Sequence, residues 1–554
     1  MLWEALGAAR DLGRVHQIAA VLVRYGFGGL VQRVGMAGAL ERAGKALHWR
    51  EPEDLARLEP AARVRRALEE LGPTFVKLGQ ILATRGDLFP PEWIAEFGKL
   101  QDAAPALPFA ELRAQLVEDL GEAPEAVFAE LDPVPLAAAS LAQVHRARLA
   151  DGTAVVLKVR RPGIRPVIEA DLRLLARLAE IVESEAPDLR RYRPREVVRQ
   201  FAHSLRRELD FSAEGRNAER IAASFADRPE INIPRIHWQW TGERLNVQDF
   251  IEGVPGRAAA ALPAGFDRKL LARRGAGAVL KMVLEDGFFH ADPHQGNVFY
   301  LPDNRLAFID FGMVGRLPEA RRYEVAELLH GLVDRDGGLV TQVLLGWSDA
   351  AEADGDALRA DIDRFVDEYH GVPLKQLDFG AMLGDVVGIL REHGLALPPD
   401  LALMIKAFVT LEGLGRQLDP DFDIAGEAAP YLREVILAHH APDAIARRGW
   451  RGLVSVADLL AGLPHDLARL LRVARRGSLK LEVDVPPLKA FGDQLDRAAS
   501  RLTMGIVTAA LIVGSSIALT VNRSDSVSLI GLLGFVGAML GGLWVLVSVW
   551  RGGR

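Results

Sequence analysis

Two acidic residues and one asparagine stand at a spacing that suits phosphoryl transfer. Asp292 is followed five residues later by Asn297, and Asp310 stands directly before a Phe-Gly pair. Asp292 can orient or deprotonate a hydroxyl group, whereas Asn297 and Asp310 can offer oxygen ligands to a Mg²⁺ ion that bridges ATP phosphates. Oxygen-only ligation suits a hard cation and argues against zinc at this site.

Both carboxylates follow apolar runs that are typical of buried strands. Phe288 and Phe289 precede Asp292, and residues 306–309 (Leu-Ala-Phe-Ile) precede Asp310. Taken singly, each acid is most simply a solvated loop residue. Because a carboxylate beside a buried strand needs a partner, the two together favour a shared site.

A lysine, Lys158, lies within a third apolar run, residues 155–159. Burying its ammonium is unfavourable unless an anion lies opposite, and the α- and β-phosphates of ATP are that anion in kinase folds. The alternative is an edge-strand lysine that faces water. This alternative is weakened by the scarcity of lysine, since the chain has ten lysines among 67 lysines and arginines combined.

The residues before this strand predict a strand, a short loop and a second strand over 135–145. Asp151 and Gly152 then form a tight turn into the lysine strand. Alanine lets backbone N–H groups approach a phosphate but resists positive φ, so we expect a stiff phosphate-binding loop here. A small-residue helix is the alternative. The loop residues, in the position of the glycine-rich loop of protein kinases, are Ala137, Ala138, Ala139 and Ser140.

These motifs together resemble the UbiB family of atypical kinases, the AarF/ADCK group. Residues 75–80 (Phe-Val-Lys-Leu-Gly-Gln) are similar to its Lys-x-Gly-Gln motif, and residues 208–211 (Glu-Leu-Asp-Phe) are similar to its Glu-x-Asp motif. The resemblance implies an α+β, bilobal protein-kinase-like fold with a helical N-terminal extension. It also implies binding of ATP and Mg²⁺, a role in ubiquinone (coenzyme Q) biosynthesis, and ATP hydrolysis more than phosphorylation of other proteins.

The resemblance further implies a glutamate partner for the lysine. Glu214 is the candidate that would orient Lys158, with Glu208 and Glu219 as alternatives. Glu214 lies 56 residues downstream of Lys158. A helical insertion over 171–185, where apolar residues recur at helical spacing, would fill that interval.

Two more pairs of residues are assigned to the site by the resemblance. Lys77 and Gln80 share one face of a helix expected to begin near residue 73, and this helix is expected to cover the active site as a gate. Glu208 and Asp210 are assigned to the nucleotide and metal region beside it. Because these two acids are two residues apart, both reach one site only if a helix starts or bends between them.

Three features depart from the family pattern. Ala142 stands where glycine is common, and residues 247–250 (Val-Gln-Asp-Phe) stand where a Met-Glu hinge is common. No Ala-Pro-Glu segment for docking a peptide follows Gly312. The last departure lowers the expectation of a protein substrate.

Composition excludes several classes of function. The chain has no cysteine, which excludes disulfides, thiol catalysis and thiolate metal sites. The net charge of −7 is small for 554 residues. Since arginine clusters are offset by nearby acids, we expect no nucleic-acid partner.

The C-terminal region predicts a transmembrane helical hairpin. Residues 503–521 and 527–550 are nearly uncharged, and each reaches the ~20 residues that span a bilayer. Four arginines flank the open side of the hairpin against one in its loop, so the positive-inside rule places the kinase-like part in the cytoplasm. Gly537 and Gly541 form a Gly-x-x-x-Gly pair that can pack the two helices together or join two chains in a homodimer.

The sequence thus predicts six consecutive parts. Residues 320–440 alternate apolar helical patterns with Gly and Pro breaks, as a helical C-lobe would. The parts are an amphipathic helical N-terminal region at 1–60, an extension with the Lys-x-Gly-Gln motif at 61–130, a kinase-like N-lobe at 131–255, a kinase-like C-lobe at 256–440, linker helices at 441–500 and the transmembrane hairpin at 501–554.

The predicted function is that of an atypical kinase or ATPase, anchored in a bacterial inner membrane, that supports ubiquinone biosynthesis. Its expected partners are quinone-pathway enzymes or an isoprenoid lipid. Two alternatives stay open. The loop around Asp292 also resembles that of aminoglycoside and choline phosphotransferases, which favours a small-molecule or lipid phosphotransferase. A non-enzymatic nucleotide-binding scaffold also fits, because intact metal ligands do not prove turnover.

Overall fold

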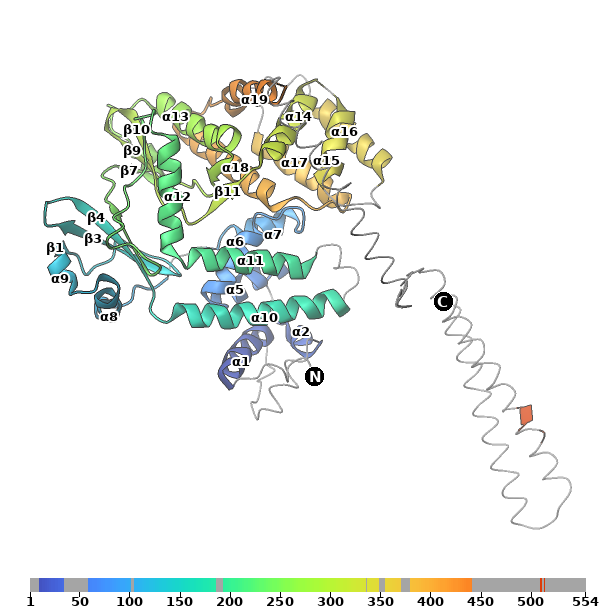
Figure 1. Cartoon of the computed structure of the whole chain (residues 1–554). Coiled ribbons are helices and arrows are strands. Elements are labelled where there is room, and N and C mark those ends of the chain that lie inside the picture. The colour runs from blue at the N-terminus through green and yellow to red at the C-terminus, as the bar shows by residue number, and fades with distance from the viewer. Residues whose placement is uncertain are drawn as a thin grey trace, which may run out of the picture. The chain divides into compact units, whose positions relative to one another are not determined.

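The computed structural model describes most of the chain up to residue 440. The described residues are 9–33, 58–100, 104–185, 193–334, 336–347, 354–369, 379–440, 509–510 and 513 (Figure 1). The chain divides into two units, residues 1–447 and 448–554, and the helices and strands described lie in the first. Apart from residues 509, 510 and 513, the predicted linker helices and transmembrane hairpin lie outside the described residues. Within the described ranges, no helix is both long and apolar enough to cross a membrane.

A five-stranded antiparallel sheet carries the predicted lysine strand. The strand order is β1-β3-β4-β6, with β2 paired to the same strand β3. The predicted strand, loop and strand are β2 and β3, and Gly152 takes φ 87° in the tight turn between β3 and β4. The bounds are β1 Phe128–Leu131, β2 Ala137–Ala138, β3 Ala142–Leu149, β4 Ala154–Arg160 and β6 Leu245–Asp249.

One face of this sheet packs on a short helical segment. Val155, Leu157 and Val159 alternate along β4 and are fully buried, as the apolar run predicted. They share a core with Leu112 and Leu116 of α8, so the strand that holds Lys158 is fixed from its apolar side. The helices here are α8 Phe109–Leu120 and α9 Pro124–Val127.

Three helices join β4 to β6. The predicted insertion helix exists, although it begins at Ile164 rather than at residue 171. The next helix ends at Glu208, and Asp210 caps the following one by accepting a hydrogen bond from Ser212 N. The chain therefore bends between Glu208 and Asp210, which was the condition for both acids to reach one site. The bounds are α10 Ile164–Glu185, α11 Pro194–Glu208 and α12 Phe211–Ser224.

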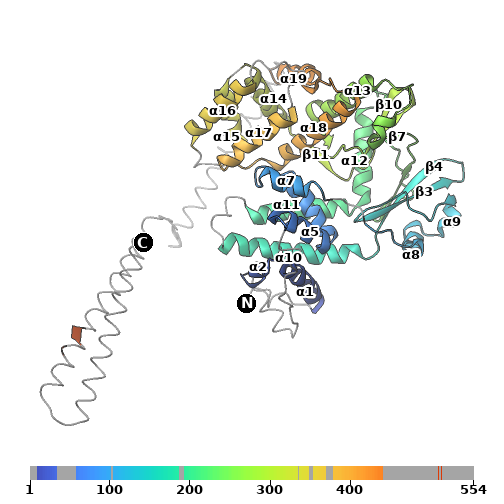
Figure 2. The ribbon, with the colours of Figure 1, turned by 180° about the vertical axis from the view of Figure 1, so that it is seen from behind.

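The N-terminal helices pack on this insertion. Asp171 of α10 is fully buried and accepts hydrogen bonds from Arg14 (2.6 and 2.9 Å) and Thr74 (2.7 Å), so a buried charge ties α1, α6 and α10 together. In Figures 1 and 2, α5, α10 and α11 lie beside one another. The bounds are α1 Ala9–Arg24, α2 Gly28–Arg33, α5 Pro60–Leu71, α6 Pro73–Leu82 and α7 Pro91–Phe97.

Two small sheets follow in the second lobe. One has the order β5-β10-β9-β7, in which only the β5–β10 pair is parallel, and the other pairs β8 with β11. Gly315 of β11 lies so close to Phe289 of β8 that an added Cβ would stand 2.1 Å from the ring. The strands are β5 Ile231–Asn232, β7 Val254–Pro255, β8 Phe288–His290, β9 Val298–Leu301, β10 Arg305–Phe308 and β11 Val314–Arg316.

Helices make up the rest of the second lobe. Their apolar faces share one core with β8, β9 and β10, and both predicted buried runs before Asp292 and Asp310 are strands of that core. The α-helices are α13 Arg268–Leu280, α14 Glu319–Asp334, α15 Gly337–Trp347, α16 Gly355–Tyr369, α17 Phe379–Glu392, α18 Pro399–Leu418 and α19 Ile424–His440. The shorter helical elements are the 3₁₀-helices η2 Gly256–Ala261 and η4 Pro302–Asn304 and the π-helix η3 Lys281–Glu285.

Candidate active site

Lys158 lies between two carboxylates that come from different parts of the chain. Its Nζ is 2.9 Å from both carboxylate oxygens of Glu214 and 3.2 Å from Oδ1 of Asp310. Of the three candidate partners, the structure pairs Glu214 with Lys158. The alternatives have other partners, because Glu208 pairs with Lys77 and Glu219 accepts a hydrogen bond from Trp238.

The three charges of this cluster are strongly coupled. Burial opposes the charged form of Lys158, but Asp310 and Glu214 outweigh it and raise the pKa of the ammonium. Desolvation by the surrounding protein opposes ionisation of Asp310, although its side chain is still 46% exposed, yet Lys158 and Lys77 hold the pKa of this carboxyl well below its usual range. Burial, with the negative charges of Asp310 and Glu208, raises the pKa of Glu214 to about 7. Lys158 thus stays protonated, and of the two carboxylates Asp310 is the one that stays ionised to the lower pH.

The backbone at Asp310 is in an uncommon conformation. Asp310 takes φ 61°, in the left-handed region, and its Oδ1 accepts a hydrogen bond from Gly312 N at 3.3 Å. Aspartate tolerates this region better than branched residues do, and such outliers cluster at functional sites. The turn aims the carboxylate of Asp310 at Lys158 rather than along the strand direction of β10.

Helix α12 contacts both the lysine and the turn after Asp310. Glu214 binds Lys158, and Asn217, one turn later, donates from Nδ2 to the carbonyl oxygen of Phe311 at 3.0 Å. Asp210 starts the same helix, and its side chain contacts Ser212 and Arg216 within α12 itself. Asn217 therefore has a positioning role that the sequence motif did not reveal, while the contacts of Asp210 are those of a helix cap.

The loop that carries Asp292 is held by a buried histidine. His290 is fully buried, and burial lowers its pKa, which keeps the ring neutral. Its Nδ1 accepts from the backbone N–H of Asp292 (3.2 Å), so the proton is on Nε2, which donates to the carbonyl oxygen of Ile309 (3.1 Å). The histidine thereby fixes the Asp292 loop to the strand end that precedes Asp310.

Asn297 lies between the same two segments. Its Nδ2 donates to the carbonyl oxygen of Asp292 at 3.1 Å, and its own carbonyl oxygen accepts from Ile309 N at 2.9 Å. Because the amide nitrogen is used in this way, Oδ1 is the atom that can ligate a metal ion. Among the described residues there is no group of three or more His, Cys, Asp or Glu side chains that could hold a metal. A carboxylate and an amide oxygen nevertheless fit Mg²⁺, which completes its shell with phosphate oxygens and water.

Asp292 has a partner that the sequence did not suggest. Its Oδ1 lies 2.8 Å from Nζ of Lys406 on α18, and both side chains are 26% exposed. The signal that could have found Lys406 is the scarcity of lysine, which also drew attention to Lys158.

The Lys-x-Gly-Gln helix is α6, as predicted from its start near residue 73. Lys77 Nζ lies 2.6 Å from Oε1 of Glu208, and its charge contributes to the low pKa of Asp310. Gln80 donates from Nε2 to the carbonyl oxygen of Leu100 at 3.2 Å. The structure thus brings Lys77 to the charge cluster and places Gln80 in a neighbouring cavity wall.

The alanine-rich loop is a tight turn rather than a helix. Ala139 N donates to the carbonyl oxygen of Ala142 at 2.8 Å, and Ser140 is buried within the turn. Arg161 donates from Nε to the carbonyl oxygen of Ala139 at 2.9 Å, which braces the loop from the end of β4. These bonds fit the expectation of a stiff loop.

A large cavity of about 1080 Å³ opens beside Asp292. Its walls come from α6 and α7, from α17 and α18, and from the loops at Ala137 and Asp292. Its polar lining residues are Gln80, Thr84, Arg257, Asp292, His294, Arg391, Lys406 and Thr410. Its apolar lining residues include Phe89, Ile94, Phe97, Leu100, Val387, Leu397, Ile405 and Val409.

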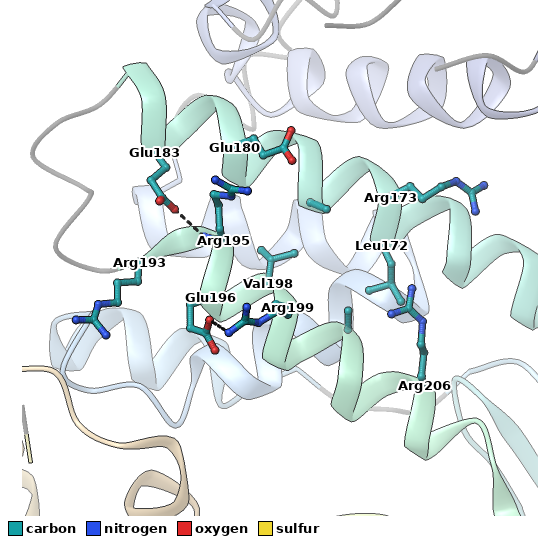
Figure 3. Close-up of a pocket in the computed structure, with 12 residues that line it drawn as sticks. Leu172, Arg173, Glu180, Glu183, Arg193, Arg195, Glu196, Val198, Arg199 and Arg206 are labelled. Carbon is teal, nitrogen blue, oxygen red and sulfur yellow. Dashed lines mark hydrogen bonds and ion pairs between the residues drawn. The ribbon is translucent and has the colours of Figure 1, made fainter. Parts of the chain in front are cut away.

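A second hollow, of about 680 Å³, lies between α10 and α11 (Figure 3). Arginine and glutamate side chains line it, and Figure 3 shows Glu196 beside Arg199 and Glu183 beside the backbone of Arg195. None of the residues of the predicted motifs lines this hollow. Three of the predicted site residues line the first cavity, namely Gln80, Ala137 and Asp292, whereas Lys158, Glu214 and Asp310 are not among its lining residues.

Comparison with known proteins agrees with this geometry. Family models match three stretches, described as the ABC1 atypical kinase-like domain (99–344), the UbiB helical domain (362–423) and the ABC1/UbiB kinase-like C-terminal domain (486–551). A protein of Cronobacter sakazakii named "Probable protein kinase UbiB" is 33% identical over 550 residues, which cover 98% of this chain and 99% of that protein. The chain belongs to the UbiB family of atypical kinases. The predicted family and the kinase-like α+β fold are confirmed.

Other relatives give the same family. A Vibrio vulnificus protein, also named "Probable protein kinase UbiB", is 36% identical over 447 residues, or 78% of this chain and 81% of its own length. A solved structure, titled as the complex of Rv3197 with erythromycin from Mycobacterium tuberculosis, has 22% identity and a TM-score of 0.46 over 65% of this chain and 92% of that chain. That TM-score is too low to support a structural argument. The UbiB relatives named here are bacterial proteins.

Proposed function

We propose that this UbiB-family chain is a magnesium-dependent ATPase of the atypical-kinase type. The observation that carries the proposal is the Lys158 ammonium within 3.2 Å of carboxylates from both α12 and the turn after β10. This arrangement places an ammonium that stays protonated, that of Lys158, beside a carboxylate that stays ionised, that of Asp310, at the junction of two lobes. A nucleotide triphosphate with a hard cation is the ligand that uses both.

In this proposal each residue has one task. Lys158, oriented by Glu214, binds the α- and β-phosphates of ATP, and Asp292 orients the attacking water or hydroxyl. Asn297 and Asp310 hold Mg²⁺, which neutralises charge on the phosphates when it is bound. Backbone N–H groups of the alanine-rich segment at residues 137–140, apart from that of Ala139, which bonds to Ala142, approach the phosphates. Helix α6, which carries Lys77 of the Lys77–Glu208 pair, closes the site.

We further propose a role in ubiquinone biosynthesis, in which ATP hydrolysis is coupled to handling of an isoprenoid lipid or of quinone-pathway enzymes. The support is the family itself and the cavity, whose apolar lining residues outnumber the polar ones and which reaches Asp292. Anchoring by the hairpin at 503–521 and 527–550, with the kinase-like part in the cytoplasm of a bacterial cell and pairing of two chains as an option, belongs to the same proposal. A family model matches the C-terminal stretch 486–551.

One other function has an observation in its favour. Because the cavity leads directly to Asp292, an alcohol or phenol bound there could accept the phosphoryl group in place of water. The chain would then be a small-molecule or lipid phosphotransferase.

The proposal is tested with the purified full-length chain in detergent, supplied with Mg²⁺ and ATP, with and without quinone-like lipids. We expect release of free phosphate that stops on chelation of the metal and in Asp292→Asn. A stable phosphorylated product would show that the chain is a phosphotransferase rather than an ATPase. Nucleotide binding with neither phosphate release nor a phosphorylated product would indicate a non-enzymatic nucleotide-binding scaffold.

A further inference from the structure

The carboxylate of Asp292 carries a negative charge, and so does the phosphoryl group whose attacking oxygen it orients. In phosphoryl transfer the residue that orients the attacking oxygen must approach the terminal phosphate, so like charges are brought within a few ångström. A cation beside Asp292 would relieve this repulsion. The loop from His290 to Asn297 contains no lysine or arginine, so that cation has to come from another element.

Lys406 is such a cation. It lies 114 residues after Asp292 in the chain, and its Nζ is 2.8 Å from Oδ1 of that carboxylate. Lys406 and Asp292 also line the same cavity, together with Ala137 of the proposed phosphate loop. The ammonium of Lys406 contacts Asp292 and faces this cavity. It is therefore within reach of a phosphoryl group whose attacking oxygen is oriented by Asp292.

The helix that carries Lys406 is a firm support. Met404, Ala407 and Phe408 of α18 are buried in the core of the second lobe, and Thr410 Oγ1 donates to the carbonyl oxygen of Lys406 at 2.8 Å. The backbone position is therefore fixed, while the four-carbon side chain keeps rotatable bonds. This combination lets the ammonium follow a phosphate without any movement of the helix.

The use of lysine here is selective. The chain has ten lysines against 57 arginines, and of the six lysines in the part of the chain that the structure describes, three face carboxylates of this site. The three pairs are Lys77 with Glu208, Lys158 with Glu214 and Asp310, and Lys406 with Asp292. A compact ammonium can share its three donors between a carboxylate and a phosphate, whereas a bidentate guanidinium would be committed to the carboxylate.

We propose that Lys406 is a catalytic residue whose ammonium contacts the terminal phosphate of ATP. The carboxylate of Asp292 holds this ammonium in place. This inference rests on the proposed ATP-binding function. It assigns a direct part in phosphoryl transfer to α18, for which the sequence predicted no role in the site. It also predicts that Lys406 distinguishes ATP from ADP, because only ATP has the phosphate that it contacts.

The test compares nucleotide affinities as well as rates. In Lys406→Met, which keeps the length of the side chain and removes its charge, we expect the affinity for a non-hydrolysable imido analogue of ATP to fall about 10- to 100-fold, as for loss of a hydrogen bond to a charged group. ADP affinity should change less than about twofold, since ADP lacks the contacted group. Lys406→Arg should recover part of the loss.

Lys269→Met is the matched control, because Lys269 on α13 is 69% exposed and lies 3.8 Å from Asp419, outside the cavity. Equal losses for ADP and the ATP analogue, or no loss for either, would overturn the inference. If Lys406→Met fails to fold, the same comparison in Lys406→Gln decides. A wild-type chain that binds the analogue without releasing phosphate would defeat the proposed ATPase and still test Lys406, because the affinity ratio needs no turnover.

Discussion

At the scale of single residues, the site depends on how one ammonium is shared. Lys158 contacts Glu214, which is 6% exposed, and Asp310, which is 46% exposed. Glu214 is therefore the buried partner that orients the lysine, whereas Asp310 faces outward and can turn to a metal ion. The low pKa of Asp310 suits this task because a metal ligand must be ionised.

Asp310→Asn should reduce Mg²⁺-dependent ATP turnover roughly 100-fold or more, because the metal loses its carboxylate ligand. Folding should be retained, since the side chain is nearly half exposed and Glu214 still pairs with Lys158. Phosphate release and thermal unfolding measure the two effects. Asp303→Asn is the matched control, because Asp303 also takes φ 61° but lies in an exposed turn. Undiminished hydrolysis in Asp310→Asn would refute the metal assignment.

His290 makes stability depend on pH. Burial lowers the pKa of His290 in the folded chain, so the unfolded chain binds protons more readily. Its contribution is complete above the ordinary histidine pKa, about 6.5, and is lost as pH falls below it. In the free energy of unfolding, measured with urea at several pH values, His290 should contribute a fall from pH 7.5 to 5.5 of up to about 1.4 kcal/mol per pH unit. Glu214, whose pKa is raised to about 7, contributes in the opposite direction over this window, so the effect of His290 is read as the difference between the wild type and a His290 variant.

The comparison for that measurement is His290→Gln, whose stability should fall less, or rise more, on acidification than that of the wild type, while a change of the exposed His203 to Gln should keep the wild-type slope. Identical slopes in the wild type and in His290→Gln would show that the buried ring does not control acid stability.

At the scale of elements, α12 links the two halves of the site. One helix presents Glu214 to the lysine strand and Asn217 to the backbone after Asp310. Its cap at Asp210 fixes where the helix begins and therefore which residues face the site. A shift of α12 would disturb the lysine and the metal ligand together.

Asn217→Ala should lower kcat about tenfold with a stability loss of about 1 kcal/mol, as for one hydrogen bond, because Phe311 and hence Asp310 lose a brace. ATP affinity should change little, since Lys158 keeps Glu214. Steady-state kinetics separate kcat from KM, and Ser224→Ala at the other end of α12 is the control. An unchanged kcat would mean that the Asn217 contact does not position the metal ligand.

The sequence predicted those elements whose signals are local. The apolar runs predicted β4, β8 and β10, and turn residues predicted the β2–β3 and β3–β4 connections. The proline near residue 73 predicted the start of α6. The pairing of Lys158 with Glu214 needed the family resemblance, because the spacing alone left three glutamates open. The contact of Lys406 with Asp292 was not predictable, since it depends on how α18 packs in the core.

At the scale of the first unit as a whole, the N-terminal helices are part of the site. The buried Asp171 holds α1 and α6 on α10, and α6 and α7 then form one wall of the cavity that reaches Asp292. Helices α17 and α18 form another wall. The extension therefore contributes to the cavity wall, and under the proposed function it would favour entry of an apolar ligand over a peptide.

Gly384→Phe should test the cavity. Gly384 lines it, and a Cβ built there meets no atom within 4 Å, so the ring can enter without a backbone clash. We expect basal phosphate release to persist and any stimulation by quinone-like lipids to fall severalfold. Gly388→Phe, one turn along α17 with equal space but outside the cavity, is the control. Equal stimulation in both variants would argue against lipid binding in this cavity.

The most direct test of the central claim is a crystal structure of the chain with Mn²⁺ in place of Mg²⁺ and a non-hydrolysable ATP analogue. We predict anomalous density for the metal between Asn297 and Asp310, with the phosphates of the analogue in contact with Nζ of Lys158. Metal density elsewhere, or an analogue bound away from Lys158, would contradict the account.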